Sequence, residues 1–357
     1  MNPFKVIERY CQSDPFLMAM MRGLLGVYDY KWRRATSDLE VLHIEKTFWS
    51  PLYNLDTNRR SRKFVLAGKI DKVVKDGNSV VIYDHKTTSS QIGSDSAYWR
   101  TLQIEGQPRQ YELLLRANGI KVDRVVWDVV RKPNIRPKKL TKAAHGSVLA
   151  SGKYFGWAMS NETLSELANG MDRENPEMFE VRVYETVAED TSEYLSRKSI
   201  PNMREDLYRH NQNMWDMAAD VVESRRRHEK SGRVSYNPGA CLQWGTPCRY
   251  LGICEGTDRP DSGNWREGPV HPELDVEEIE TDKEILTNSR LKCFQSCRKK
   301  HHFKYDMALE RNDDAEKESE ALYFGTVWHH VMDAWWADIS GFEPEGEESY
   351  GNLNEMA

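Results

Sequence analysis

The stretch FVLAGKIDKVVKDGNSVVIYDHKTTS, residues 64–89, is the part of the chain from which the rest can be interpreted. Two runs of apolar and β-branched residues flank the turn signal KDGN, and this pattern predicts a β-hairpin. Because side chains alternate between the faces of a strand, Asp84 and Lys86 share one face and His85 points away from it. With Asp71 one strand over, these residues can hold a divalent metal ion against a phosphate group.

The composition describes a polar chain. Charged residues make up 30% of its 357 residues, and the mean hydropathy is -0.73. The length suffices for the core of one large domain or two smaller ones. No apolar run approaches the ~20 residues that a membrane-spanning helix needs, and the opening MNPFKVIERYCQ lacks the basic-then-apolar order of a signal peptide. We therefore expect a cytoplasmic protein with no membrane partner.

The net charge of -6 argues weakly against nucleic acid as a partner, but the basic residues are clustered. Clusters occupy residues 59–63, 131–142, 225–227 and 298–300. Phosphate binding depends on a local patch and not on the global sum of charges. Such runs are most often solvated surface, so they support binding to DNA only where another feature points to it.

The chemistry of the hairpin has two interpretations. In the functional one, Asp71 and Asp84 bind Mg²⁺ or Mn²⁺, the His85 carbonyl is a third ligand, and Lys86 assists the attacking water and neutralises charge in the transition state. In the structural one, the acids are surface and turn residues. The helix expected at residues 103–117 carries Gln107 and Tyr111 on one face, because they lie four residues apart.

Three cysteines, Cys241, Cys248 and Cys254, lie in a short segment rich in turns. Three thiols this close can be three corners of an iron–sulfur cluster or a zinc site. The alternative is three unrelated buried cysteines.

The order G-x-x-D, then acid-x-Lys-Thr, then Q-x-x-x-Y resembles the PD-(D/E)XK nucleases, specifically the RecB-like, AddB-type exonuclease branch in a phage-borne form. The resemblance implies an α/β (α+β) fold of restriction-endonuclease type, with a central mixed sheet flanked by helices. It also implies a metal-dependent DNA nuclease, an exonuclease in this branch, in a bacterial or phage-infected cell. Asp71 and Asp84 are then metal ligands, Lys86 is catalytic, and Gln107 and Tyr111 act at the substrate.

Two stretches near the other end of the chain resemble the segments that open the fold in this branch. FGTVWHHVMDAWW, residues 324–336, resembles the helix that carries G-T-x-x-H, which makes His329 the third metal ligand and His330 the lesser candidate. LTNSRLKCFQSCRKKHHFKYDMAL, residues 286–309, resembles the segment with the first cluster cysteine. The resemblance implies that Cys297 joins Cys241, Cys248 and Cys254 around a [4Fe-4S] cluster. Zinc stays an alternative to the cluster, and Cys293 stays an alternative to Cys297.

The motif order is that of a circular permutation. We expect a nuclease core at residues 1–256 that includes three cluster cysteines, a linker at 257–280, a segment at 281–340 with the remaining cysteine and histidine, and a disordered tail at 341–357. One permuted domain is favoured, because neither part has a complete site alone. A swapped dimer and a gene-boundary artefact are the alternatives.

The expected partners are DNA and a helicase or recombination protein. Two other functions stay open: a DNA-binding subunit that does not cut, and an inactive fragment. Among the secondary-structure elements, Met178–Thr186 is expected to be a strand, and 288–310 and 321–337 are expected to be helices.

Overall fold

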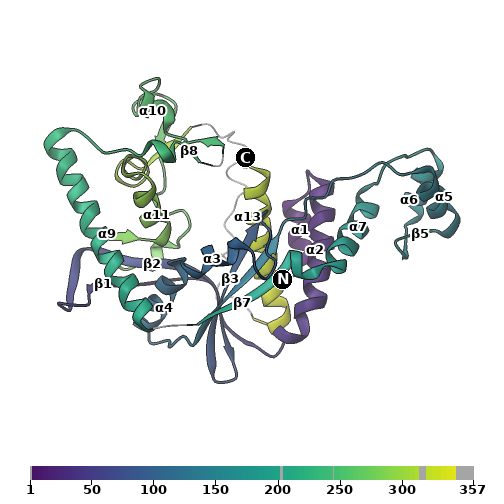
Figure 1. Ribbon diagram of the computed structural model, residues 1–357, viewed down its shortest axis with the longest axis horizontal. Coiled ribbons are helices and arrows are strands. Elements are labelled where there is room, and N and C mark those ends of the chain that lie inside the picture. Colours follow the sequence, from purple (N-terminus) through teal and green to yellow (C-terminus); the bar gives the residue numbers. More distant parts are fainter. Residues whose placement is uncertain (1, 202–203, 244, 313–318, 343–357) are drawn as a thin grey trace.

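A six-stranded mixed sheet lies at the centre of the computed structural model, with helices on both of its faces (Figure 1). The strand order is β1-β2-β3-β4-β7, and β11 pairs with β2 in addition. The structure describes residues 2–201, 204–243, 245–312 and 319–342. The predicted α/β fold with a central mixed sheet flanked by helices is confirmed.

The strands and helices have the following bounds. The strands are β1 Glu40–Asn54, β2 Arg59–Asp76, β3 Ser79–Thr88, β4 Arg124–Arg131, β5 Lys153–Tyr154, β6 Trp157–Ala158, β7 Leu195–Pro201, β8 Leu242–Gln243, β9 Thr246–Pro247, β10 Trp265–Glu267, β11 Glu284–Leu286 and β12 Leu309–Arg311. The α-helices are α1 Pro3–Tyr10, α2 Pro15–Thr36, α3 Ala97–Gln103, α4 Gln107–Ala117, α5 Lys142–Ser151, α6 Asn161–Ala168, α7 Pro176–Glu189, α8 Thr191–Tyr194, α9 Arg204–Ser231, α10 Leu251–Glu255, α11 Asn288–Ser296, α12 Arg298–His301 and α13 Glu320–Ser340.

The predicted hairpin is β2 and β3, joined by a tight turn. Their antiparallel pairing runs from Asp76↔Ser79 to Lys72↔Tyr83 and stops there. Further back along β2, the same edge pairs in parallel with β11 at 64–66. Residues 67–71 of β2 therefore lie in a fork between β3 and β11, and this fork is where the candidate site forms.

Each face of the sheet packs on its own hydrophobic cluster. On one face, α1, α2, α7 and α13 bury large aromatic side chains against β3 and β4, including Trp328, Trp335 and Trp336. On the other face, α4, α9 and α11 cover the sheet with Tyr111 and Met214 among the buried residues. Burial at about 25 cal/mol per Å² of apolar surface makes such clusters the main source of stability.

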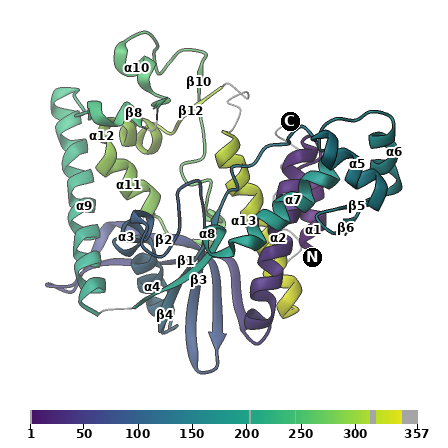
Figure 2. The ribbon, with the colours of Figure 1, turned by 45° about the vertical axis from the view of Figure 1, so that its right-hand side comes forward.

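The segment after residue 280 packs into the same sheet as the segment before 257. β11 extends the sheet beside β2, and α13 lies against α1 and β3, so that a helix from each of the two segments lies side by side (Figures 1 and 2). Of the tail expected at 341–357, residues 343–357 lie outside the part that the structure describes.

Some sequence-based expectations differ from the structure. The predicted strand Met178–Thr186 is wrong, because these residues belong to helix α7. The Asn175 side chain accepts from the Met178 N–H at 3.0 Å and begins that helix. The helix expected at 288–310 ends at Ser296, since Cys297 has an extended backbone, and a short α-helix and a π-helical turn follow. The segment 257–280 carries the short strand β10, which pairs with β12.

An arm extends from the sheet between β4 and β7. It consists of residues 132–175 with α5, α6 and the small hairpin β5–β6, and Figure 1 shows it beyond α2 and α7. Its own small core contains Val148, Tyr154 and Leu167. Within the described residues, the search for a helix with the length and apolar character of a membrane span found none.

Candidate active site and cysteine cluster

The two acids of the hairpin lie where β2 and β3 separate. Asp84 is fully buried and Asp71 is 8% exposed. The backbone N–H of His85 donates to Asp71 Oδ2 at 2.8 Å. This side-chain hydrogen bond replaces the backbone hydrogen bond that β2 no longer offers where its pairing with β3 ends. The Asp71 carboxylate is thereby fixed at the inner end of the fork.

Helix α13 brings His329 to this fork. His329 Nδ1 lies 3.8 Å from Asp71 Oδ2. A Cβ added at Gly325 would lie 2.9 Å from Thr87 Oγ1, so any larger residue would require the Thr87 side chain or the helix to shift. His330 instead stacks on Tyr10 with ring centroids 4.7 Å apart. The geometry therefore favours His329 over His330.

Glu45 on β1 completes a group that sequence reasoning missed. Ligand atoms of Glu45, Asp71 and His329 lie within 4.8 Å of one another. Glu45 has a φ of 48°, which is uncommon for a residue other than glycine and is typical of functional sites. In the sequence, Glu45 is an acid within a predicted strand. That it lies directly opposite Asp71 follows from the register of β1 with β2, which is visible only in the folded sheet.

Asp84 is not a member of this group of three and is paired with Lys86 instead. Burial raises the pKa of Asp84 to about 7, with Asp71 adding to the effect and Lys86 opposing it. Burial, with Asp333 adding to it and Lys72 opposing it, raises the pKa of Glu45 to about 8. Asp84 Oδ1 is buried and has no hydrogen-bond partner among the described residues. Buried carboxylates with raised pKa values and an oxygen that lacks a hydrogen-bond partner are suited to binding a divalent cation.

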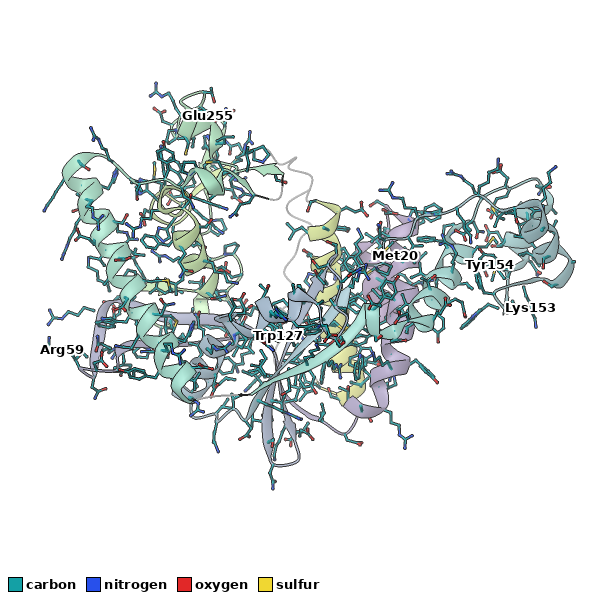
Figure 3. The ribbon with its side chains drawn as sticks, viewed as in Figure 1. Met20, Arg59, Trp127, Lys153, Tyr154 and Glu255 are labelled. Atoms are coloured by element: carbon teal, nitrogen blue, oxygen red, sulfur yellow. The ribbon has the colours of Figure 1, made fainter. Side chains whose placement is uncertain are left out.

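Lys86 carries a positive charge in this site. Burial lowers its pKa, but Asp84 and Asp71 outweigh burial, and the net pKa is raised. Its ammonium group also lies 5.2 Å from the ring centroid of Trp127, which Figure 3 labels near the centre of the molecule. Burial lowers the pKa of His329 despite Asp71, which leaves the neutral imidazole that a metal ion needs.

The predicted pair on α4 lies together and next to the acids. Gln107 Nε2 donates to Tyr111 Oη at 2.7 Å. Burial, together with Asp84 and Asp71, raises the pKa of Tyr111 well above its ordinary value, so its hydroxyl stays protonated. A Cβ at Gly68 would lie 3.0 Å from the Tyr111 ring, which explains why glycine begins the G-x-x-D motif.

A buried ion pair ties α13 to β2 behind the site. Lys72 Nζ lies 2.5 Å from Asp333 Oδ1, and neither side chain is more than 6% exposed. Glu45 Oε1 lies 3.5 Å from the same ammonium group. Asp333 is one helical turn after His329, and Lys72 directly follows Asp71. The ion pair therefore holds α13 on β2 close to the place where His329 meets Asp71.

The four predicted cluster cysteines line one small cavity above α11. Cys241, Cys248, Cys254 and Cys297 all contribute to its wall, beside Tyr250 and Lys300. All six cysteines of the chain are free thiols. Cys293 does not line this cavity. The structure thus brings together the cysteines predicted from two distant segments and favours Cys297 over Cys293.

A sequence model of the PD-(D/E)XK nuclease superfamily matches residues 13–255, roughly two thirds of the chain. The match includes both acids and the lysine of the fork and ends before the segment with Cys297 and His329. The comparisons with curated proteins and with solved structures gave no match. The chain, with its mixed sheet and its acid–x–lysine strand, belongs to the PD-(D/E)XK nuclease superfamily.

Proposed function

We propose that the protein is a metal-dependent deoxyribonuclease of the RecB-like branch that hydrolyses phosphodiester bonds from a DNA end. The observation that carries this proposal is the meeting of Glu45, Asp71 and His329 in the fork, beside the Asp84–Lys86 pair. An imidazole and buried carboxylates around a cationic lysine suit the polyanionic transition state of phosphoryl transfer.

Asp71, Asp84 and His329 would hold Mg²⁺ or Mn²⁺, and Glu45 lies close enough to bind the ion directly or through water. The bound ion would supply a polarised phosphoryl oxygen and an activated water. Lys86, held by Asp84, places a positive charge where negative charge develops on the phosphate. The protonated Tyr111 hydroxyl, held by Gln107, can donate to the DNA backbone.

A Lys86→Ala variant tests the assignment. We expect it to keep its fold and to lose cleavage of end-labelled single-stranded and duplex DNA by at least 100-fold, the range found for removal of one stabilising group. The control is Lys75→Ala, because Lys75 lies on the same hairpin and is half-exposed at its far end. Cleavage by Lys86→Ala at the wild-type rate, or cleavage by the wild type in EDTA, would refute the proposal.

We also propose that Cys241, Cys248, Cys254 and Cys297 hold a structural [4Fe-4S] cluster. The four cysteines line one small cavity, as ligands of a single cluster would, and the resemblance of the motifs favours the cluster over zinc. The cluster would join α11 and α12 to the segment after α9.

We expect the Cys248→Ala variant to lose the cluster. We expect loss of the brown colour and of absorbance near ~400 nm, typical of iron bound to thiolates, together with a lower unfolding temperature. Cys293→Ala is the matched control and should keep the colour, because Cys293 lies outside the cavity wall. A colourless wild type that contains zinc would refute the cluster and leave the nuclease proposal untouched.

The resemblance of the motifs also supports a cellular location and a biological process for the protein. We place the protein in the cytoplasm of a bacterial or phage-infected cell, in DNA recombination, repair or processing. A helicase or recombination protein would be its partner there. Pull-down of such a partner with the Lys86→Ala variant, which cannot degrade the DNA, tests this context.

A further inference from the structure

Most basic residues of the arm lie in its outgoing half. Residues 131–158 contain seven Lys and Arg and no Asp or Glu, whereas residues 159–187 contain two basic and seven acidic residues. The chain as a whole has a net charge of -6. A run this one-sided gives the arm a local positive field that favours a polyanion.

This basic half begins at the candidate active site. β4 runs parallel to β3, so both strands end at the same edge of the sheet. The Lys132 N–H donates to the Thr88 carbonyl at 2.8 Å, directly after the strand that carries Asp84 and Lys86. Arg131 and Lys132 at this edge pair with Glu193 and Glu320, so the exposed positive charge lies further out along the arm.

The outgoing segment is held in one geometry by its neighbour. The N–H of Lys138 donates to Glu174 Oε2 at 3.0 Å, and the N–H of Leu140 donates to the Asp172 carbonyl at 2.8 Å. Lys139 pairs with Asp172. Within the described part of the chain, Lys138, Lys142 and Lys153 have no ion pair with a carboxylate, which leaves their charges available to a ligand, whereas Arg136 lies near Glu320. Arg136, Lys138, Lys142 and Lys153 are all exposed.

Phe155 lies at the tip of the β5–β6 hairpin, directly after Lys153 and Tyr154, which Figure 3 labels in the arm. Phe155 is 51% exposed. Its φ is 49° and that of Gly156 is 86°, the pattern of a turn in which Asn or Gly is usual at both positions. A bulky aromatic residue in the left-handed region is costly, and such outliers point to a function.

Tyr154 and Trp157, on either side of Phe155, are held by hydrogen bonds, whereas the Phe155 ring makes a T-shaped contact with the Tyr154 ring, with ring centroids 4.7 Å apart. Tyr154 Oη donates to Glu174 at 2.7 Å, and Trp157 Nε1 donates to Glu185 at 2.7 Å. The ammonium group of Lys138 lies 6.0 Å from the centroid of the Phe155 ring. The hairpin thus presents a flat apolar face with a cation beside it.

We propose that the basic segment 131–142 and Phe155 bind a single strand of DNA outside the active site, with an unpaired base stacked on Phe155. Stacking on an aromatic face beside a phosphate-binding cation is how proteins hold single strands without sequence preference. A duplex keeps its bases stacked inside, so it offers Phe155 no base. The proposal rests on the proposed nuclease function and specifies that its substrate is single-stranded DNA.

The test measures binding in EDTA, without cleavage. The probes are a fluorescent single-stranded oligonucleotide, the same strand with abasic sites, and the corresponding duplex. We expect Phe155→Ala to weaken single-strand binding on the order of tenfold and to leave duplex binding unchanged. Phe155→Trp should restore binding. Tyr30→Ala removes an aromatic side chain that is 85% exposed on α2 and should have no effect.

Two further measurements separate stacking from a structural role. The wild type should bind the abasic strand as weakly as Phe155→Ala does, and Phe155→Ala should not distinguish the two strands. Lys138→Gln should lower the salt dependence of binding by about 0.7 in the logarithmic slope, because the variant neutralises one phosphate fewer. Equal single-strand binding by Phe155→Ala and wild type, or an equal loss for single strand and duplex, would overturn the proposal. Cleavage by the wild type and its loss in Lys86→Ala are measured separately and do not depend on Phe155.

Discussion

At the scale of single residues, three successive side chains of β3 lie on alternate faces of the sheet and have different roles. Asp84 and Lys86 face the fork. His85 lies on the other face, where Trp336 Nε1 donates to its Nε2 at 3.1 Å and Asp128 lies 3.5 Å from its Nδ1. Burial lowers the pKa of His85 well below its ordinary value. His85 is therefore a neutral packing residue whose backbone N–H, and not its ring, serves the site.

His301 gives a prediction about pH. Burial lowers the pKa of His301 to about 3, and Arg290 acts in the same direction. In the unfolded chain its pKa is about 6.5. Between these values the unfolded state binds more protons, so the free energy of unfolding falls as the pH falls from about 6.5 toward about 3. The His301 contribution is on the order of a few kcal/mol.

We expect His301→Gln to flatten this dependence, because glutamine keeps an acceptor for the Arg290 Nε–H and cannot be protonated in this range. Urea unfolding of both proteins at several pH values between about 6.5 and 4 measures it. The same slope for wild type and variant would show that His301 does not cause the loss of stability.

The placement of single residues, as distinct from their roles, could be predicted where a motif fixes their spacing. Asp71, Asp84 and Lys86 follow from the alternation of side chains along a hairpin, and Gln107 and Tyr111 from one helical turn. The placement of Glu45 could not be predicted in this way. It depends on a positive φ within a strand and on the register of β1 with β2, which no local pattern encodes.

At the scale of elements, α13 is the helix whose position matters most. Two contacts fix it on the sheet: the close approach at Gly325 and the buried pair of Lys72 with Asp333. Removing one partner of a buried pair leaves the other charge buried and uncompensated, which costs about 3–5 kcal/mol. The helix would then hold His329 less firmly against Asp71.

We therefore expect Asp333→Ala to lower the free energy of unfolding by about 3–5 kcal/mol and to raise the Mg²⁺ concentration needed for half-maximal cleavage. The double variant Lys72→Met, Asp333→Leu should regain most of the stability, because it leaves no charge buried. Asp338→Ala is the control on the same helix, since its pair with Arg33 is exposed at 3.2 Å. Such a pair contributes about 0–1 kcal/mol. Equal losses for Asp333→Ala and Asp338→Ala would contradict this role.

Elements were predicted less well where two periodicities compete. The sequence of α7 contains MFEVRVYET, in which apolar and polar residues alternate as in a strand. Its buried residues Phe179, Val183 and Val187 recur every four positions, and Asn175 caps the first turn. The tertiary packing of α7 on α2 selects the helical period, and local alternation does not reveal that packing.

At the scale of the whole molecule, contacts across the sheet join the two distant segments of the chain. β11 pairs with β2, Asp333 binds Lys72, and Arg225 on α9 lies 2.6 Å from Glu284 on β11. One permuted domain, with a swapped dimer as the alternative, stays a prediction from the motifs. The motifs did not predict the pairing of β11 with β2.

Cutting the chain between the segments tests this organisation. A protease site inserted between Pro260 and Asp261, next to the exposed Arg259–Asp261 pair, would open the segment that joins them. We expect the two pieces to stay together in native buffer, to elute as one monomer-sized species and to keep their nuclease activity. Separation of the pieces after the cut, or a dimer before it, would contradict a single closed domain. An uncut chain with the same insertion is the control.

The position of His329 on α13 also has a consequence for how the protein is made. The ribosome completes the hairpin with Asp71, Asp84 and Lys86 about 240 residues before it reaches His329. At about 5–20 residues per second, this interval lasts roughly 12 to 50 s. During that time the nascent chain has the acids and the lysine but no histidine beside them. Assembly of the proposed site thus waits for a late event in translation, and under the proposed function a partly synthesised chain would lack a complete metal site.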